Sequence, residues 1–245
     1  MTLAPTPTSE SRRELHGHLA RPRRPRAHRQ PDETRIAGER TCREWIRLSA
    51  RLDHGGQLPN NALDEDWRSA IDFIRVRLHT RFVDPLDALR REPYAGFLTV
   101  AIESLLIEAL ERLRQGKRLE ERASSCLVAT FLRERLSFKG DFRSDAHRKP
   151  LRTCPCVACD FYRSVRSGLV HEGETQNGWV VRTRQSALLH HENGLHVVDR
   201  DRFHRALVAE VRAYLIQLED PAEHALRANL LKTLDGVCDA AARRP

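Results

Sequence analysis

Two groups of side chains in this 245-residue sequence have types and spacings that suit chemistry. The first is Cys154, Cys156 and Cys159, at Cys-x-Cys-x-x-Cys spacing. Thiolates this close together can bind one Zn²⁺. The second group is Arg166 and His171, separated by four residues. An imidazole transfers protons near neutral pH and a guanidinium holds a phosphate as charge builds on it, so this pair suits RNA cleavage by the RNA's own 2′-hydroxyl.

The zinc interpretation needs a fourth ligand, because a structural zinc site is almost always four-coordinate. The second Cys-x-x-Cys pair of a zinc ribbon is missing from the sequence. The candidates for the fourth position are Cys126, His147 and Cys238. Alternatively, the thiols are small buried residues at the start of a helix. We therefore predict no cofactor, with a structural zinc as the alternative. His190, His191 and His196 form a second candidate group for a metal. This candidate is weaker, because histidines on an exposed hairpin usually lie on the surface without binding a metal.

The spacing of Arg166 and His171 also has a structural explanation that involves no catalysis. On an ideal helix two residues five apart diverge by about 140°, because each residue advances roughly 100°. The pair converges only if the helix ends or bends, or if a second copy of the chain meets it. Otherwise it is a cationic pair near a helix end, interacting with the last carbonyls.

The residues around this pair resemble a known family. Residues 161–171, with Phe-Tyr-x-x-Val-Arg-x-Gly-Leu-Val-His, followed by Gly-Trp-Val-Val-Arg at 178–182, are similar to the signature segment of the HEPN superfamily. The resemblance is sharpest over residues 158–183, extends loosely to residues 94–116 and 203–218, and covers about half of the chain. It implies a helical fold. In active members of the superfamily it also implies a metal-independent endoribonuclease centre, usually formed where two subunits meet.

Carried over to this sequence, the resemblance assigns roles to individual residues. Arg166 would hold the scissile phosphate and His171 would act as general acid or base. Ser167 and Tyr162 would contact the substrate. Ser167 stands where the superfamily often has a larger polar residue, which shortens its reach. Tyr162 lies one helical turn before Arg166, a position that also suits packing in the core.

Three functions, with their partners, compete at this point, and the first two follow from the resemblance. The first is a homodimeric, metal-independent endoribonuclease of the toxin or phage-defence kind, which binds RNA and is controlled by an antitoxin or another regulatory protein. The second is a non-catalytic HEPN module that binds nucleotides, RNA or a protein. The third, based on the cysteines and the basic N-terminus, is a zinc-stabilised regulator that binds nucleic acid.

The elements that must position these residues are mainly helical. Apolar side chains recur at helical spacing from residue 41 onward, and the period changes near Trp179, where Asn193-Gly194 is a strong hairpin signal. We predict an all-α, HEPN-like bundle of about six helices over residues 41–240, with a small β-hairpin at about 179–198 after the motif helix. The helices are expected at about 64–78, 94–115, 123–136, 155–170 and 203–218, with a last one opening at 220–223.

Charge and composition indicate how the N-terminal segment behaves and in which compartment the protein is expected. The formal net charge is +8, of which +4 lies in residues 1–40, with nine Arg against five acids. Residues 1–38, rich in Pro and Arg, are predicted to form a disordered basic tail, either a nucleic-acid tether or a solvated leader. No apolar signal segment follows the N-terminus, and glutamates interrupt the richest apolar run, 97–113. We therefore expect a soluble cytoplasmic protein with no membrane partner and with reduced cysteines.

Overall fold

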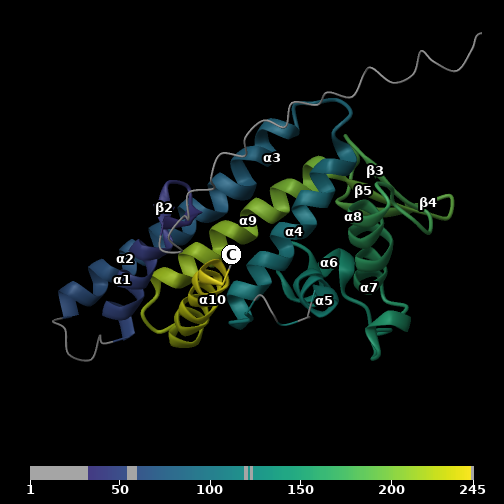
Figure 1. The fold of residues 1–245 in the computed structure, drawn as a ribbon. Coiled ribbons are helices and arrows are strands. Elements are labelled where there is room, and N and C mark those ends of the chain that lie inside the picture. The colour runs from purple at the N-terminus through teal and green to yellow at the C-terminus, as the bar shows by residue number, and fades with distance from the viewer. Residues whose placement is uncertain (1–32, 54–59, 119–120, 122–123, 244–245) are drawn as a thin grey trace, which may run out of the picture.

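The computed structural model describes residues 33–53, 60–118, 121 and 124–243. This part of the chain is mainly helical and holds two small sheets (Figure 1). The predicted helical fold is confirmed, but the all-α description is incomplete because of the sheets. No described helix is both long enough and apolar enough to cross a membrane.

The described chain begins with a short hairpin of β1 (Arg35–Ala37) and β2 (Arg40–Thr41), which leads into α1 (Cys42–Asp53). Most of the predicted basic tail, residues 1–32, lies outside the described residues. The end of that prediction is wrong, because Ile36 is only 2% exposed. Its backbone carbonyl also accepts a hydrogen bond from Arg77. The ordered chain therefore begins before residue 38, because Ile36 supplies an apolar side chain to the core.

A long central helix, α4 (Gly96–Gln115), organises the core. It packs against α5 (Ser124–Glu134), α9 (Arg200–Glu219) and α10 (His224–Ala242). The helix ends where the sequence predicts, because Gly116 adopts the left-handed conformation with φ 62° and its N–H bonds back to the carbonyl of Arg112. A side chain at Gly116 would also collide with Asn229, since a Cβ would lie 2.4 Å from its Oδ1.

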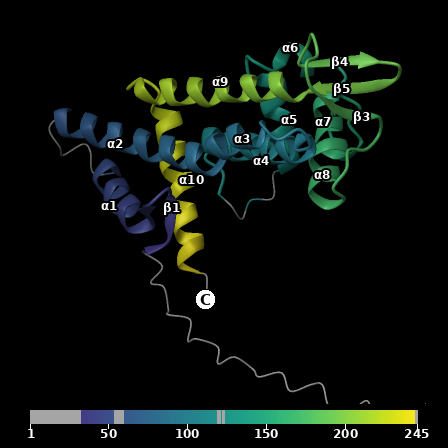
Figure 2. The same cartoon turned by 90° about the horizontal axis from the view of Figure 1, so that it is seen from above.

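The remaining long helices enclose this central helix. α2 (Asn60–Leu78) packs on α1 and α9 and continues through a π-helical turn, His79–Val83, into α3 (Asp84–Leu89). Seen from above, α2 and α9 lie in adjacent layers and α10 crosses them (Figure 2). The predicted stripe of α9 is buried along its whole length. It consists of Phe203, Leu207, Val211, Leu215 and Leu218.

The last helix starts later than predicted. Asp220 was expected to cap it, but α9 runs to Glu219 and α10 begins only at His224. The Asp220 carboxylate instead accepts a hydrogen bond from the N–H of Ala222 at 2.9 Å. Asp and Pro therefore form the turn between two helices here rather than the first turn of the second helix.

The predicted hairpin is part of a three-stranded sheet, ordered β3-β5-β4. β4 (Leu189–Glu192) and β5 (Leu195–Asp199) pair antiparallel around the turn at Asn193-Gly194, where both residues have positive φ. β3 (Trp179–Arg182) pairs with β5 in parallel. The hairpin prediction is therefore right for 189–199 and wrong for 179–182, because those residues form a third strand by a crossover connection.

Residues 161–171, the first part of the segment compared with the HEPN superfamily, belong to one continuous helix, and residues 179–182 form β3. That helix consists of α7 (Val157–Phe161), a π-helical segment (Tyr162–Ser167) and α8 (Gly168–His171), and we call it the motif helix. Phe161 anchors it in the core by stacking on Phe203 at 5.5 Å between ring centroids. The same ring meets Phe142 and Trp179 edge to face. The helix is thereby fixed between α6 (Lys139–Phe142), α9 and β3.

Candidate metal centre and motif helix

Three cysteines and a histidine come together where the chain enters the motif helix. Cys154 follows a 3₁₀ turn at Leu151–Thr153, Cys156 immediately precedes α7, and Cys159 lies in the first turn of α7. His147 lies in the turns after α6 and faces the thiols. Cys156 occupies the N-cap position of α7, and Cys159 lies three residues later, nearly one helical turn on. Both side chains therefore project from the first turn of that helix, on similar sides.

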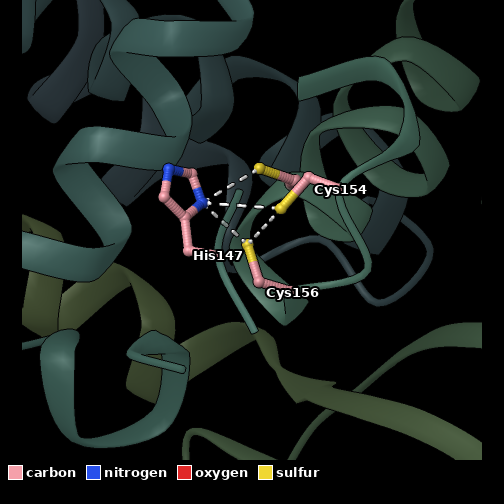
Figure 3. A group of neighbouring side chains, drawn as sticks. His147, Cys154 and Cys156 are labelled. Carbon is pink, nitrogen blue, oxygen red and sulfur yellow. Dashed lines mark hydrogen bonds between the residues drawn. The ribbon is translucent and has the colours of Figure 1, made fainter. Parts of the chain in front are cut away.

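The four ligand atoms lie as close together as ligands of a single ion. Nδ1 of His147 lies 3.2 Å from Sγ of Cys156, 3.5 Å from Sγ of Cys154 and 3.7 Å from Sγ of Cys159. Sγ of Cys154 and Sγ of Cys156 are 3.3 Å apart. Figure 3 shows the imidazole nitrogen pointing at the thiols of Cys154 and Cys156. All four atoms lie within 4.8 Å of one another, so this group could hold a metal ion.

The surroundings favour the ligand forms of Cys154 and His147, whereas burial and the neighbouring thiols raise the pKa of Cys159. All three cysteines are buried. Burial opposes ionisation of Cys154, but N–H groups of Arg148 and Cys156 and the neighbouring thiols lower its pKa to about 7. The N–H of Arg148 lies 3.3 Å from that sulfur. Burial, together with the charges of Arg133 and Lys149, lowers the pKa of His147, which keeps its imidazole neutral and able to donate a lone pair.

The structure separates the candidates for the fourth ligand. His147 completes the group with the three predicted cysteines. Cys126 is exposed on α5. Cys238 is buried in α10, where its thiol faces the carbonyl of Cys42 at 4.0 Å. Neither of these two cysteines belongs to the group.

The weaker histidine candidate does not converge. His191 and His196 are cross-strand partners, with ring centroids 4.2 Å apart. His190 pairs with Val197, one residue along the strand, and so lies on the opposite face of the sheet. The stacked partner of His196 is Trp179, at 4.5 Å.

The structure places Arg166 against the central helix. Its guanidinium donates to the carboxylate of Glu108 at 3.1 Å, and its side chain is only 14% exposed. The guanidinium also lies over the Tyr162 ring, 5.6 Å from the centroid. Tyr162 and Arg166 are four residues apart in the π-helical segment, so their side chains share one face of the motif helix. Within one subunit, Arg166 is thus an ion-paired residue.

Glu108, the partner of Arg166, also contacts two other polar side chains. Its carboxylate accepts hydrogen bonds from Ser124 at 2.6 Å and from Arg112 at 3.1 Å. Burial opposes its ionisation, but these hydrogen bonds and the charges of Arg166 and Arg112 leave its pKa below the usual range. The carboxylate therefore stays ionised beside Arg166 at neutral pH.

His171 occupies a different environment from Arg166. It is exposed in the last turn of the motif helix, next to Val170, which is 42% exposed. Ser167 is half-buried at the end of the π-helical segment. The four residues implied by the HEPN resemblance therefore share one helix, but the arginine lies against α4 and the histidine faces solvent.

The chain was also compared with known proteins. No family model, no curated protein and no solved structure matches it. The function therefore has to be argued from the residues themselves.

One feature of the site was missed in the sequence, and a second was left open among three candidates. Glu108 was read only as an acid that interrupts an apolar run, and its partner Arg166 is 58 residues away. His147 was one of three candidate ligands, with no preference among them. A useful signal would have been that His147 precedes the first cysteine by seven residues, near enough for a short loop to close around an ion.

Proposed function

We propose that this protein is a zinc-stabilised helical domain in which His147, Cys154, Cys156 and Cys159 bind one Zn²⁺. A single observation carries the proposal: the four ligand atoms lie within 4.8 Å of one another in a short segment of the chain. The ion would close the segment 147–159 onto the start of the motif helix. It would thereby fix the helix that carries Arg166 and His171. We call residues 143–159, which include the approach to His147, the zinc loop.

The separations and the donor types together suit zinc. Bond lengths of about 2.3 Å to sulfur and 2.0–2.1 Å to nitrogen place the nitrogen and a sulfur ligand of a tetrahedral zinc about 3.5–3.6 Å apart. The separations from Nδ1 of His147 are 3.2, 3.5 and 3.7 Å. Thiolate and imidazole ligands are also the donors that zinc prefers, whereas the oxygen donors preferred by calcium or magnesium are absent from this group. Four protein ligands leave no open position, which indicates a structural rather than a catalytic ion.

Metal analysis of the purified chain tests the proposal. We expect about one zinc per chain in the wild type and loss of zinc in Cys156→Ser, with a fall in the thermal midpoint, because a structural zinc contributes folding free energy. The matched control is Cys126→Ser, which removes an exposed thiol outside the group. A wild-type chain that contains no zinc after purification with zinc in the medium, or equal zinc in both variants, would refute the proposal.

A second candidate function is metal-independent cleavage of RNA, with Arg166 and His171 as the reacting pair. Its support is the HEPN resemblance together with the exposure of His171 and Val170 at the end of the motif helix. An exposed imidazole beside an apolar side chain is available to a second copy of the chain, which would supply the other half of a shared site. The Arg166–Glu108 pair supports the alternative, a non-catalytic module, because a neutralised guanidinium is a weaker phosphate ligand.

Cleavage assays separate these two possibilities. In magnesium-free buffer with the zinc retained, an active centre cleaves RNA, and His171→Ala abolishes cleavage because the proton-transfer group is lost. His224→Ala is the matched control, since His224 is exposed at the start of α10. A shared site also requires activity per chain to fall on dilution below the dimer dissociation constant. Cleavage that survives His171→Ala would refute the mechanism, and absence of cleavage would leave a module that binds RNA, nucleotides or a regulatory protein.

A further inference from the structure

The outer surface of the zinc loop is strongly basic. Within residues 143–152, four cations stand against one acid, Asp145. All four are exposed to solvent. They are Arg143, Arg148, Lys149 and Arg152, which we call the loop cations.

The loop cations form no ion pairs with the described carboxylates. Some surface arginines elsewhere are neutralised by carboxylates, as Arg51 is by Asp66 at 2.7 Å and Arg182 by Glu192 at 2.7 Å. Among the described residues, no carboxylate lies within ion-pair distance of a loop cation. Their charge is therefore available to a partner.

The fold gives this charged segment a fixed shape. The backbone N–H of Arg148 is directed at Sγ of Cys154, so one loop cation is attached to a proposed zinc ligand. Arg163 of the motif helix donates to the carbonyl of Leu151 at 3.0 Å and ties the far side of the loop to the helix. A rigid array of cations loses less conformational entropy on binding than free lysine and arginine side chains on a flexible tail.

The charge of the bound ion does not cancel this surface. Zinc with three thiolates and a neutral imidazole carries a single net negative charge, and it is buried beneath the loop. The four loop cations outnumber that charge and Asp145 together. The exposed side of the loop thus remains positive when zinc is bound.

We propose that the zinc loop binds the phosphodiester backbone of nucleic acid through the loop cations. Three of the four are arginines, whose planar guanidinium matches a phosphate with two parallel hydrogen bonds. The surface does not suit a lipid membrane, because none of the large exposed apolar side chains lies within 143–152 to enter a bilayer. This inference rests on the proposed zinc site, since the ion sets the shape of the loop.

The binding surface is separate from the proposed cleavage centre. Val157 and His171 mark the two ends of the motif helix, and a helix of this length spans about 21 Å at 1.5 Å per residue. The zinc loop lies at the first end and His171 at the second. The loop would therefore dock the nucleic acid without contacting the scissile bond.

Fluorescence anisotropy with labelled single-stranded 20-mers tests the proposal. The DNA strand lacks a 2′-hydroxyl and reports binding without cleavage, and an RNA strand of the same sequence runs beside it. The loop variant is Arg148→Gln with Arg152→Gln. The control variant is Arg205→Gln with Arg212→Gln, which removes the same charge from the exposed face of α9. Zinc content is measured for every protein.

We expect the loop variant to bind both strands about tenfold more weakly at moderate salt, with zinc unchanged. The slope of log K against log salt should become shallower by about 1.4, at roughly 0.7 for each lost contact to a single strand. The control variant should bind like the wild type.

Equal affinities of the loop variant and the wild type, or equal losses in both variants, would overturn the proposal. So would wild-type binding to vesicles with anionic lipid but not to nucleic acid. If the purified chain contains no zinc but the loop variant still binds nucleic acid more weakly than the wild type, only the proposed metal site is refuted.

Discussion

Gly168 is the residue at which the motif helix meets the turn that follows it. A Cβ at this position would lie 2.4 Å from the backbone carbonyl oxygen of Glu174. The returning chain is held there by a hydrogen bond of 2.8 Å from the N–H of Gln176 to the carbonyl of Ser164. Glycine is therefore needed for close backbone approach, and its φ of −57° is ordinary helical geometry.

Replacing this glycine should destabilise the protein. We expect Gly168→Ala to lower the free energy of unfolding by about 1–3 kcal/mol, because the methyl group displaces backbone rather than a flexible side chain. The measurement is urea denaturation followed by circular dichroism. Gly140→Ala is the control, since nothing lies within 4 Å of its Cβ position in α6. Alanine there should be neutral or stabilising by up to about 1 kcal/mol. Equal effects of the two substitutions would contradict the close approach at Gly168.

Among the elements, three helices are joined by the polar contacts of one buried histidine. His204 of α9 contacts Glu103 of α4 through Nδ1 at 3.0 Å and Asp87 of α3 through Nε2 at 3.0 Å. Glu103 is fully buried, and one of its carboxylate oxygens has no hydrogen-bond partner. Burial raises the pKa of Glu103 to about 7, although His204 and the charges of Arg90 and Arg200 act in the opposite direction.

This raised pKa makes the stability of the helix bundle depend on pH. The unfolded chain releases the Glu103 proton near pH 4.5, whereas the folded protein keeps it until about pH 7. The folded state thus binds more protons between these values, so this group lowers stability as pH rises through that window. The penalty is complete above about pH 7 and amounts to at most about 3 kcal/mol.

Substitution by glutamine should remove this pH dependence. Glu103→Gln keeps a hydrogen-bonding oxygen for His204 but cannot ionise. We expect the loss of unfolding free energy between pH 5 and pH 8 to be smaller in Glu103→Gln than in the wild type, as measured by urea denaturation at each pH. Glu174→Gln, at an exposed position, is the control and should follow the wild type. A variant that loses as much stability as the wild type over this range would show that Glu103 is ionised throughout.

Elements determined by local signals are those that the sequence predicts well. The left-handed Gly116 ends α4, and the apolar stripe from Phe203 to Leu218 defines α9, because capping and helical periodicity act within a few residues. The parallel pairing of β3 with β5 joins Trp179 to His196 across an intervening strand and turn. No periodicity within β3 distinguishes that pairing from the antiparallel hairpin that was predicted.

The same limit applies to the candidate site. Three of the proposed ligands lie within six residues of the sequence, so their spacing predicts them, whereas His147 joins them only through the loop that follows α6. The ion pair between Arg166 and Glu108 joins two helices whose residues are 58 positions apart, so no local pattern in the sequence indicates it. Side-chain types identify the chemistry here, whereas tertiary packing decides which groups meet.

At the scale of the whole molecule, the zinc loop and the N-terminal elements belong to opposite sides of the core. The loop connects to the core through the rings of Phe142, Phe161 and Phe203. On the other side, α1 packs against α2 and α10, where Trp45 of α1 donates to Asp235 of α10 at 2.7 Å. Both views show α1 and α7 at opposite ends of the molecule (Figures 1 and 2). Loss of zinc should therefore have local consequences.

Hydrogen exchange before and after zinc removal measures that locality. We expect amides in residues 142–171 and in β3 to lose protection, because the ion holds the loop and the ring of Phe161 carries the disturbance to Trp179. Amides of α1 and α10 should keep theirs. Zinc is removed with a thiol-reactive reagent in the Cys126→Ser background, so that the exposed thiol does not react as well. Equal loss of protection everywhere would show that zinc holds the entire core together, and unchanged protection in residues 142–171 would show that the loop keeps its structure without the ion.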